Sequence, residues 1–257
     1  MQITQQHVDY NVQTKGPLYQ LWHGHWSSSD YKAGSGGYPK GGEGLVEASA
    51  LLSIIKASGP CFRFLELGAG WGRQSLAITG IINNLKIGGP SYRGLAIEAE
   101  PQHYKWLVEG FVRNKISVTP VYGAVSDTCG WPMFQTGRPD TWYGQSLVGE
   151  GDLQVPQYSL DHLARTFGFD GPLDLIHMDV QSVEVEVLTG GPKTKANAKY
   201  IYIGLHSNSF IDPIINLCPE HKPVIIARKG ETTVVPGFKE PVHCPSDGII
   251  LLERKCT

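Results

Sequence analysis

Cysteine pairs, strong net charge and long apolar runs are all scarce in this sequence, and each scarcity excludes a class of protein. The five cysteines are scattered without a CxxC pair, so neither a disulfide framework nor a zinc site is expected. A formal net charge of −2 argues against a nucleic-acid binder, which would need clustered lysine and arginine. No apolar run approaches the ~18 to 20 residues of a membrane span, and the opening MQITQQHVDY lacks the basic and apolar regions of a signal peptide. We therefore expect a cytoplasmic protein with no membrane partner and no nucleic-acid partner.

The first sixty residues differ in their residue pattern from the rest of the sequence. Residues 22–44 combine many glycines with two tryptophans and two tyrosines, which favours a loop or lid over a plain linker. The same rings could instead pack as core, or form the contact of a homodimer. Leu45 to Ala57 then shows the apolar spacing of a helix. We expect residues 1–60 to form an N-terminal lid and helix, and residues 61–257 to form the main domain.

From residue 61 onward, strand and helix patterns alternate. This alternation predicts an α/β, Rossmann-like fold with a mostly parallel seven-stranded sheet and helices on both faces. The last strand has no helix after it and should form an antiparallel edge. The predicted strands span residues 62–67, 92–98, 116–122, 173–179, 200–206, 224–228 and 248–253, and the predicted helices 73–84, 101–114, 159–167, 183–188 and 210–218.

A glycine-rich turn, Glu66-Leu67-Gly68-Ala69-Gly70-Trp71-Gly72, lies between the first predicted strand and its helix. Glycines let the backbone turn sharply and approach a ligand, and the crevice of such a sheet lies at the carboxyl ends of its strands. A dinucleotide site has G-x-G-x-x-G spacing, whereas these glycines alternate, and Glu66 would repel a pyrophosphate. The turn therefore favours a phosphate-free, positively charged nucleoside cofactor over NAD. A tight structural turn is the alternative.

Two further strand ends fit such a cofactor. Glu98 ends the second strand, where a carboxylate can accept both ribose hydroxyls. The small-residue turn Tyr122–Asp127, which contains Ala124 and Val125, could border an adenine. Glu98 could alternatively cap the helix that begins at Pro101.

Several segments carry a resemblance to a known family: FLELGAGWGRQSLAI, GLAIEAEP, YGAVSD, YSLDHL and DLIHMDVQSVEVEVLTGG. They are similar to the FkbM-type S-adenosylmethionine-dependent methyltransferases, most of whose characterised members are O-methyltransferases. This resemblance implies the Rossmann-like fold of the class I methyltransferase superfamily. The resemblance spans roughly residues 62–206. The sequence departs from the family pattern at Gln181 and Ser182, where Glu and Gly are usual, and at His177, where Lys is common. The cofactor contacts that the resemblance implies are Glu66, Gly68, Ala69, Gly70, Gly72, Glu98, Ala99, Ala124, Val125 and Asp179.

Asp179 and His206 are the candidate catalytic residues. They end neighbouring parallel strands and should open into one crevice. A hydroxyl acceptor must lose a proton, either to a general base or through a metal that lowers its pKa. We favour His206 as a base oriented by a carboxylate over a shared divalent ion, since one Asp and one His suit Mg²⁺ poorly. His206 could also be a hydrogen-bonded strand-end residue. His177 alternates with Asp179 along the strand, and we expect it to be a buried, satisfied histidine.

The predicted function is methyl transfer from S-adenosylmethionine to a hydroxyl of a small molecule or sugar, without a required metal. Amino-methylating enzymes often carry an Asn/Asp-Pro-Pro-Tyr motif, and the fourth strand is instead followed by Asp179-Val180-Gln181-Ser182. An N-methyltransferase and a non-catalytic nucleoside-binding module remain alternatives. Residues 138–145 could supply acceptor contacts.

Overall fold

The computed structural model describes residues 42–85, 90–136, 147 and 151–255, together with the backbone of three short strands. These are β1 (Thr14–Lys15), β2 (Leu18–Gln20) and β3 (Trp26–Ser28), which form a small antiparallel sheet. Most of the predicted lid at 22–44 and all of the predicted acceptor segment at 138–145 lie outside the described residues.

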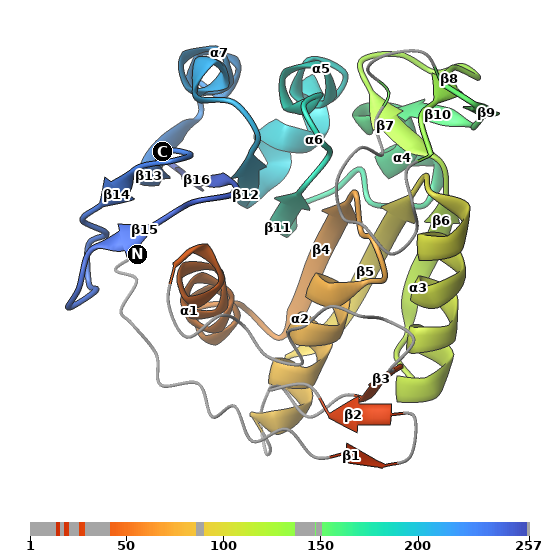
Figure 1. The fold of residues 1–257 in the computed structure, drawn as a ribbon, viewed down its shortest axis with the longest axis horizontal. Coiled ribbons are helices and arrows are strands. Elements are labelled where there is room, and N and C mark those ends of the chain that lie inside the picture. The colour runs from red at the N-terminus through yellow and green to blue at the C-terminus, as the bar shows by residue number, and fades with distance from the viewer. Residues whose placement is uncertain are drawn as a thin grey trace.

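A seven-stranded sheet forms the centre of the molecule (Figure 1), in the order β13-β16-β12-β11-β4-β5-β6. Every strand runs parallel to its fellows except β16, which is antiparallel to both of its neighbours. This confirms the predicted Rossmann-like class I methyltransferase fold. The strands are β4 (Cys61–Leu67), β5 (Ser91–Glu98), β6 (Val118–Tyr122), β11 (Leu173–Met178), β12 (Ala198–Leu205), β13 (His221–Ala227) and β16 (Gly248–Arg254).

The predicted place of the last strand is wrong. We expected β16 to form the edge of the sheet, but it is inserted between β12 and β13, and β13 forms that edge. The run Ile249–Leu252 is apolar at every position, and its side chains are buried alternately in the clusters on the two faces. A continuous apolar run is typical of a strand covered on both faces rather than of a half-exposed edge.

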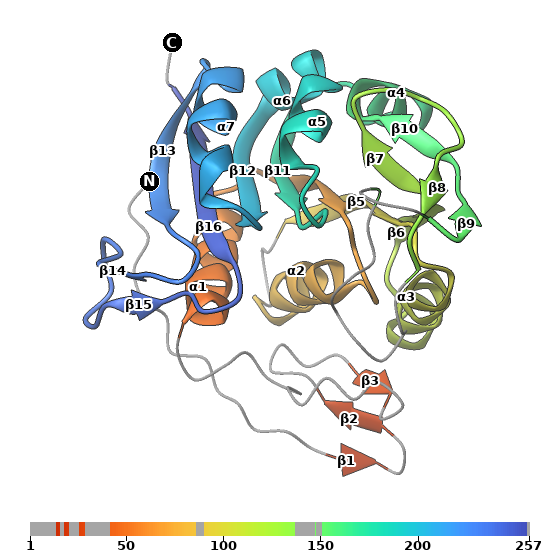
Figure 2. The same ribbon diagram turned by 45° about the horizontal axis from the view of Figure 1, so that its top comes forward.

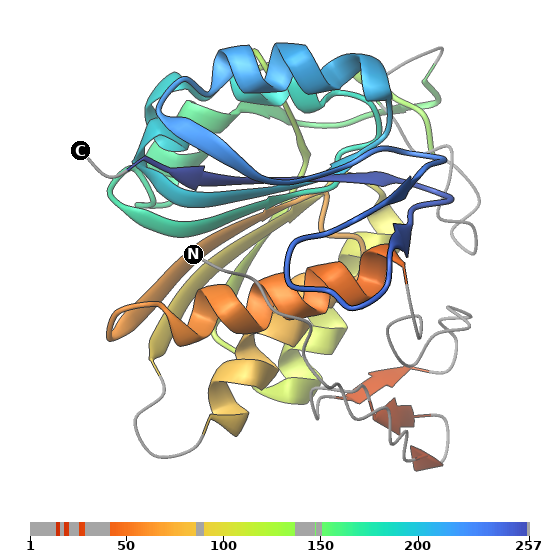
Figure 3. The same cartoon turned by 90° about the vertical axis from the view of Figure 1, so that its left-hand side faces the viewer.

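Helices cover both faces of the sheet (Figure 3, sheet seen edge-on). The bounds of α2 and α3 agree with the predicted helices, and the helix predicted from residue 210 is preceded by the 3-10 turn η1 (Asn208–Phe210). Helix α6 was not predicted. One face carries α1 (Glu43–Lys56), α2 (Arg73–Asn84) and α3 (Pro101–Asn114), and the other α4 (Leu160–Thr166), α5 (Glu184–Thr189), α6 (Pro192–Asn197) and α7 (Ile211–Leu217).

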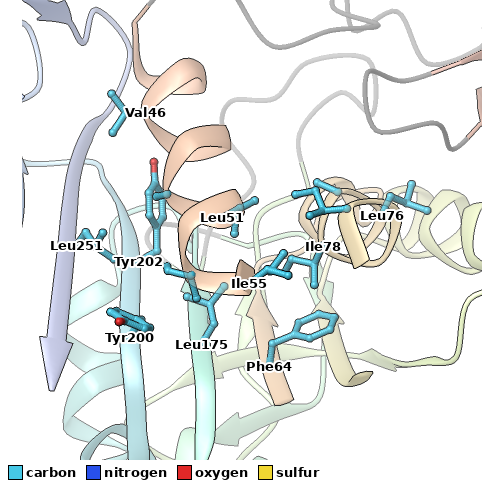
Figure 4. Close-up of a cluster of buried hydrophobic side chains, with 14 of the residues drawn as sticks. Val46, Leu51, Ile55, Phe64, Leu76, Ile78, Leu175, Tyr200, Tyr202 and Leu251 are labelled. Atoms are coloured by element: carbon cyan, nitrogen blue, oxygen red, sulfur yellow. The ribbon is translucent and has the colours of Figure 1, made fainter. Parts of the chain in front are cut away.

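The core consists of two main clusters, one on each face of the sheet. Alternation along β4 shows the division, because Phe62 and Phe64 pack on the α1–α3 side and Leu65 and Leu67 on the other. Helix α1 belongs to the first cluster (Figure 4), in which its apolar side chains lie among those of α2 and the strands. Burying each such side chain contributes about 1.5–3 kcal/mol. The helix predicted within residues 1–60 is therefore fixed to the sheet.

Small two-stranded sheets accompany the central sheet. Strands β7 (Ala124–Ser126), β8 (Met133–Phe134), β9 (Leu153–Gln154) and β10 (Gln157–Ser159) gather beside α4 (Figure 2, right), and β14 (Thr232–Thr233) pairs with β15 (Val242–His243). The sequence patterns predicted none of these. In the described part of the chain, no helix has the length and apolarity needed to cross a membrane.

Candidate active site

The glycine turn connects β4 to α2 at the carboxyl end of the sheet. Gly68, Gly70 and Gly72 have φ values of 71°, 54° and 82°, in the left-handed region that favours glycine. A Cβ at Gly68 would overlap the backbone carbonyl of Asp179, and one at Gly72 would lie 2.6 Å from a ring carbon of Phe111. The turn therefore packs directly against the end of β11, where the Asp179 amide donates to the Leu67 carbonyl at 2.9 Å.

Glu66 anchors this turn to the helix that follows it. Its buried carboxylate accepts the backbone N–H groups of Gln74 at 3.0 Å and Ser75 at 2.9 Å, and also the Ser75 hydroxyl. These amides belong to the first turn of α2 and have no partner within the helix. Burial raises the pKa of Glu66, against the opposing effects of His177 and these hydrogen bonds. The geometry gives Glu66 a structural role, and its predicted cofactor contact stays a prediction.

Glu98 links the glycine turn to the end of β5. One carboxylate oxygen accepts the Gly70 amide at 2.6 Å, and the other accepts the amides of Ala99 at 2.9 Å and Glu100 at 2.7 Å. A carboxylate has about four acceptor positions, so one remains for a ribose hydroxyl in this arrangement. Burial raises the pKa of Glu98. The helix cap considered for Glu98 is supplied by Glu100 instead.

The predicted adenine border divides between two environments. Ala99 and Ala124 are buried together in a small apolar cluster with Phe134 and Val155. Val125 packs into the main core on the α4–α7 side, because successive residues of β7 point to opposite faces. Apolar side chains, Ala124 among them, therefore lie near the ends of β5 and β6. The Val125 side chain points away from them, into the main core.

His206 lies at the centre of a cluster of carboxylates, one residue beyond the end of β12. Its Nδ1 is hydrogen-bonded to Oε1 of Glu184. Its Nε2 lies 3.4 Å from Oδ1 of Asp179 and 3.6 Å from Oδ1 of Asp247. The His206 side chain is only 6% exposed, yet neither its Nε2 nor Asp179 Oδ1 has a hydrogen-bond partner among the described residues. The structure thus brings the two candidate catalytic residues together and leaves their facing atoms unbonded.

The pKa values of both residues are raised, but by different causes. Burial lowers the pKa of His206, but the hydrogen bond to Glu184 and the charges of Asp179, Glu184 and Asp247 outweigh it and leave the pKa raised. Burial around the carboxylate raises the pKa of Asp179, and Asp247 adds to this effect while His206 opposes it. The imidazole is therefore a stronger base than an ordinary histidine.

Sequence reasoning missed two members of this cluster. Glu184 opens α5 and is fully buried, with Val187 and Leu188 on the same buried helix face. A glutamate at that apolar spacing is a signal that could have been used, because an unpaired glutamate is rarely buried. Asp247 precedes β16 and gives no such signal, since only the pairing of β16 with β12 brings it to His206.

The loop between β11 and α5 contains non-glycine residues in the left-handed backbone region. Gln181 and Ser182 have φ values of 53° and 76°, which non-glycine residues adopt at a cost. Ser182 stands at the position where the resembling family usually has glycine, and its amide donates to Glu184 Oε1 at 3.3 Å. Ser182 therefore takes, beside Glu184, a backbone conformation that glycine adopts without strain.

His177 is buried, as expected, on the α1–α3 side of β11. Its Nε2 is hydrogen-bonded to Glu47 Oε1 at 2.7 Å, and its ring stacks on Tyr202 at 5.1 Å between centroids. Its Nδ1 has no hydrogen-bond partner among the described residues, so it is satisfied at one nitrogen only. Within the described ranges, no three His, Cys, Asp or Glu side chains are placed to hold a metal ion.

A comparison with models of known protein families assigns this chain to a family. The model of the FkbM methyltransferase domain matches residues 77–224, more than half of the sequence. The chain belongs to the FkbM methyltransferase family. The matched range begins inside α2 and ends in β13, so it contains Glu98, Asp179, Glu184 and His206 but not the glycine turn.

A curated relative from Jannaschia sp. (strain CCS1), whose methyltransferase name is provisional, is 27% identical over 178 residues. That alignment covers 62% of this chain and 61% of the relative, so this FkbM-family chain spans about three fifths of its relative's length.

Two solved structures are similar at low identity. The O-methyltransferase from Bacillus cereus in complex with SAH is 15% identical, with a TM-score of 0.46 over 85% of this chain and 84% of that one. Precorrin-6y C5,15-methyltransferase from Geobacter metallireducens GS-15 is 12% identical, with a TM-score of 0.44 over 82% and 89%. The fold assignment rests on the strand order and directions described above.

Proposed function

We propose that this FkbM-family chain is an S-adenosylmethionine-dependent methyltransferase that methylates a hydroxyl oxygen of a small molecule or sugar. The observation that carries the proposal is the Glu184–His206 pair. One imidazole nitrogen is bonded to a fully buried carboxylate, and the other lies beside Asp179 at the carboxyl end of the sheet with no hydrogen-bond partner among the described residues.

The residues at the crevice suit this cofactor chemically. S-adenosylmethionine supplies an electrophilic methyl group on a positively charged sulfonium, and it also carries an ammonium group. Glu98 keeps one acceptor position for a hydroxyl, and Oδ1 of Asp179 accepts no hydrogen bond from the described residues. Negative groups at these strand ends would bind the two positive centres, whereas they would repel the pyrophosphate of a dinucleotide.

His206 would act as the general base. The Nδ1–H donates to Glu184, which fixes the tautomer that leaves Nε2 free to accept a proton. With S-adenosylmethionine bound, the hydroxyl oxygen would displace the thioether sulfur of S-adenosylhomocysteine from the methyl carbon, and Nε2 of His206 would accept the hydroxyl proton. The resulting imidazolium is stabilised by Asp179 and Asp247, whose oxygens lie within 3.6 Å of it.

This base favours oxygen over nitrogen as the acceptor atom. A neutral amine already presents a lone pair, but an alcohol must lose its proton during the transfer. A buried histidine that is held by a carboxylate, and whose other nitrogen has no hydrogen-bond partner among the described residues, meets the requirement of the alcohol. A module that only binds a nucleoside does not need such a base.

Conversion of S-adenosylmethionine to S-adenosylhomocysteine should be measured with matched acceptors: sugars, small alcohols, phenols and amines. Substituting His206→Ala or His206→Asn should lower kcat by about 10²- to 10⁴-fold, with little change in S-adenosylhomocysteine affinity. The exposed His243→Asn serves as the matched control and should leave kcat unchanged.

Three other outcomes of these assays would contradict the proposal. Near-normal turnover by both His206 variants would remove this residue from the mechanism. Turnover confined to amines would replace the hydroxyl acceptor with a nitrogen acceptor. Cofactor binding without turnover on any acceptor would favour the non-catalytic module.

A further inference from the structure

A chain of charged side chains connects α1, the start of α2 and β11. Arg73 is the first residue of α2, directly after Gly72, and its Nη2 donates to Glu47 Oε2 at 2.6 Å. The other Glu47 oxygen is bonded to His177 Nε2 at 2.7 Å. Glu47 and His177 are nearly inaccessible, with 6% and 4% of their side chains exposed, whereas the Arg73 side chain is 45% exposed. One end of a buried network therefore reaches the surface beside the glycine turn.

Arg73 supplies positive charge next to strand ends that otherwise carry carboxylates. Glu66 is the last residue but one of β4, Glu98 is the last residue of β5, and Asp179 directly follows β11. Burial raises the pKa of Asp179, and the charge of Arg73 is a minor effect that opposes this rise. A ligand with positive centres suits the carboxylates, but a ligand carboxylate among them would be repelled unless it met a cation.

The network is poorly explained as a source of stability alone. The Arg73–Glu47 pair is exposed on its arginine side, so water screens part of its attraction, and burying the Glu47–His177 pair costs desolvation free energy. The arrangement does fix the direction of the guanidinium, because both oxygens of Glu47 are engaged and His177 is held flat against Tyr202, with 9° between the rings. A planar guanidinium held in this way matches the geometry of a carboxylate ligand.

We propose that Arg73 binds the α-carboxylate of the cofactor's amino-acid end, and that Glu47 and His177 are positioning residues that orient Arg73. This inference rests on the proposed function, because it takes S-adenosylmethionine as the ligand. It assigns a role to α1, whose Glu47 would tie the first helix to cofactor recognition.

Calorimetric titration with S-adenosylmethionine and with decarboxylated S-adenosylmethionine tests this directly, because the two ligands differ by the carboxylate alone. The unchanged protein should bind S-adenosylmethionine more tightly. Substituting Arg73→Met should raise the Kd of S-adenosylmethionine by about 10- to 100-fold and leave the Kd of the decarboxylated ligand unchanged. Arg73→Lys should give a smaller loss. Arg113→Met, in the last turn of α3, is the matched control and should change neither Kd.

Glu47→Gln tests the positioning role while keeping the size of the side chain. It should raise the Kd and the KM of S-adenosylmethionine less than Arg73→Met does, and leave kcat at saturation and the Kd of the decarboxylated ligand unchanged. Circular dichroism melting checks that each variant is folded.

The outcomes separate this inference from the function on which it rests. Equal weakening of both ligands in Arg73→Met, or no weakening of either, would overturn the carboxylate assignment while leaving the cofactor class in place. If Glu47→Gln weakens both ligands equally, Glu47 is structural only. If the unchanged protein binds neither ligand, the proposed function and this inference fail together.

Discussion

His206 is bonded through Nδ1 to Glu184, a carboxylate with no exposed surface, while its Nε2 faces Asp179 Oδ1 at 3.4 Å. The two partners come from different elements, since Glu184 opens α5 and Asp179 follows β11. Both belong to the segment Asp179–Glu184, in which Gln181 and Ser182 take left-handed backbone conformations. This short loop therefore places one carboxylate at each nitrogen of the same imidazole.

The pH dependence of turnover should report the raised pKa of His206. Only the neutral imidazole accepts a proton, so kcat should rise with pH and level off above the pKa. Burial lowers that pKa, but the hydrogen bond to Glu184 and the charges of Asp179, Glu184 and Asp247 outweigh this effect. The rate should therefore reach half of its maximum at a pH above 6.5, the ordinary pKa of histidine. A pH–rate profile on a hydroxyl acceptor checks this. A half-maximal rate clearly below pH 6.5 would contradict the role given to the carboxylates.

Substituting Glu184→Gln should lower both kcat and the pKa seen in that profile. The amide keeps the size of the side chain but removes the charge that favours the imidazolium. Loss of a group that orients a histidine typically costs about 10- to 100-fold in activity. Glu186→Gln, exposed on the same helix, is the control and should match the unchanged protein. A Glu184→Gln profile that coincides with the control would show that Glu184 does not act through His206.

Substituting Ser182→Gly should stabilise the protein. The φ of 76° is unfavourable for serine and costs nothing for glycine, so the free energy of unfolding should rise by about 0.5–1 kcal/mol. Urea denaturation measures this change. Ser53→Gly, in the middle of α1, should shift the free energy of unfolding in the opposite direction. A loss of stability in Ser182→Gly would mean that the serine side chain contributes more than its backbone strain costs.

Substituting Gly68→Ala should destabilise the fold and abolish cofactor binding. The new Cβ would overlap the Asp179 carbonyl, and the φ of 71° would add strain, so a loss of at least about 2 kcal/mol is expected. Gly59→Ala is the control, because nothing lies within 4 Å of a Cβ there. Denaturation and S-adenosylhomocysteine titration of both variants check the prediction. Equal stability of the two variants would contradict the close approach of β4 and β11.

Much of the local structure could be predicted because its signals are local. The bounds of α2 and α3 followed from the glycine turn before residue 73 and from Pro101 at the start of its helix. Alternating patterns predicted the parallel sheet, and the positions of Asp179 and His206 at strand ends made their meeting an expectation. The same reasoning predicted that a carboxylate would orient His206, without saying which one.

The sequence by itself thus determined the α/β class, most helices and strands, and the residues at the carboxyl ends of the strands. Only the tertiary structure decided that β16 enters between β12 and β13, and that Glu184, Asp179 and Asp247 meet around one histidine. It also decided that Arg73, Glu47 and His177 form one network. The physical reason is that apolar periodicity fixes which face of an element is buried, whereas contacts between elements depend on how all the buried faces pack together.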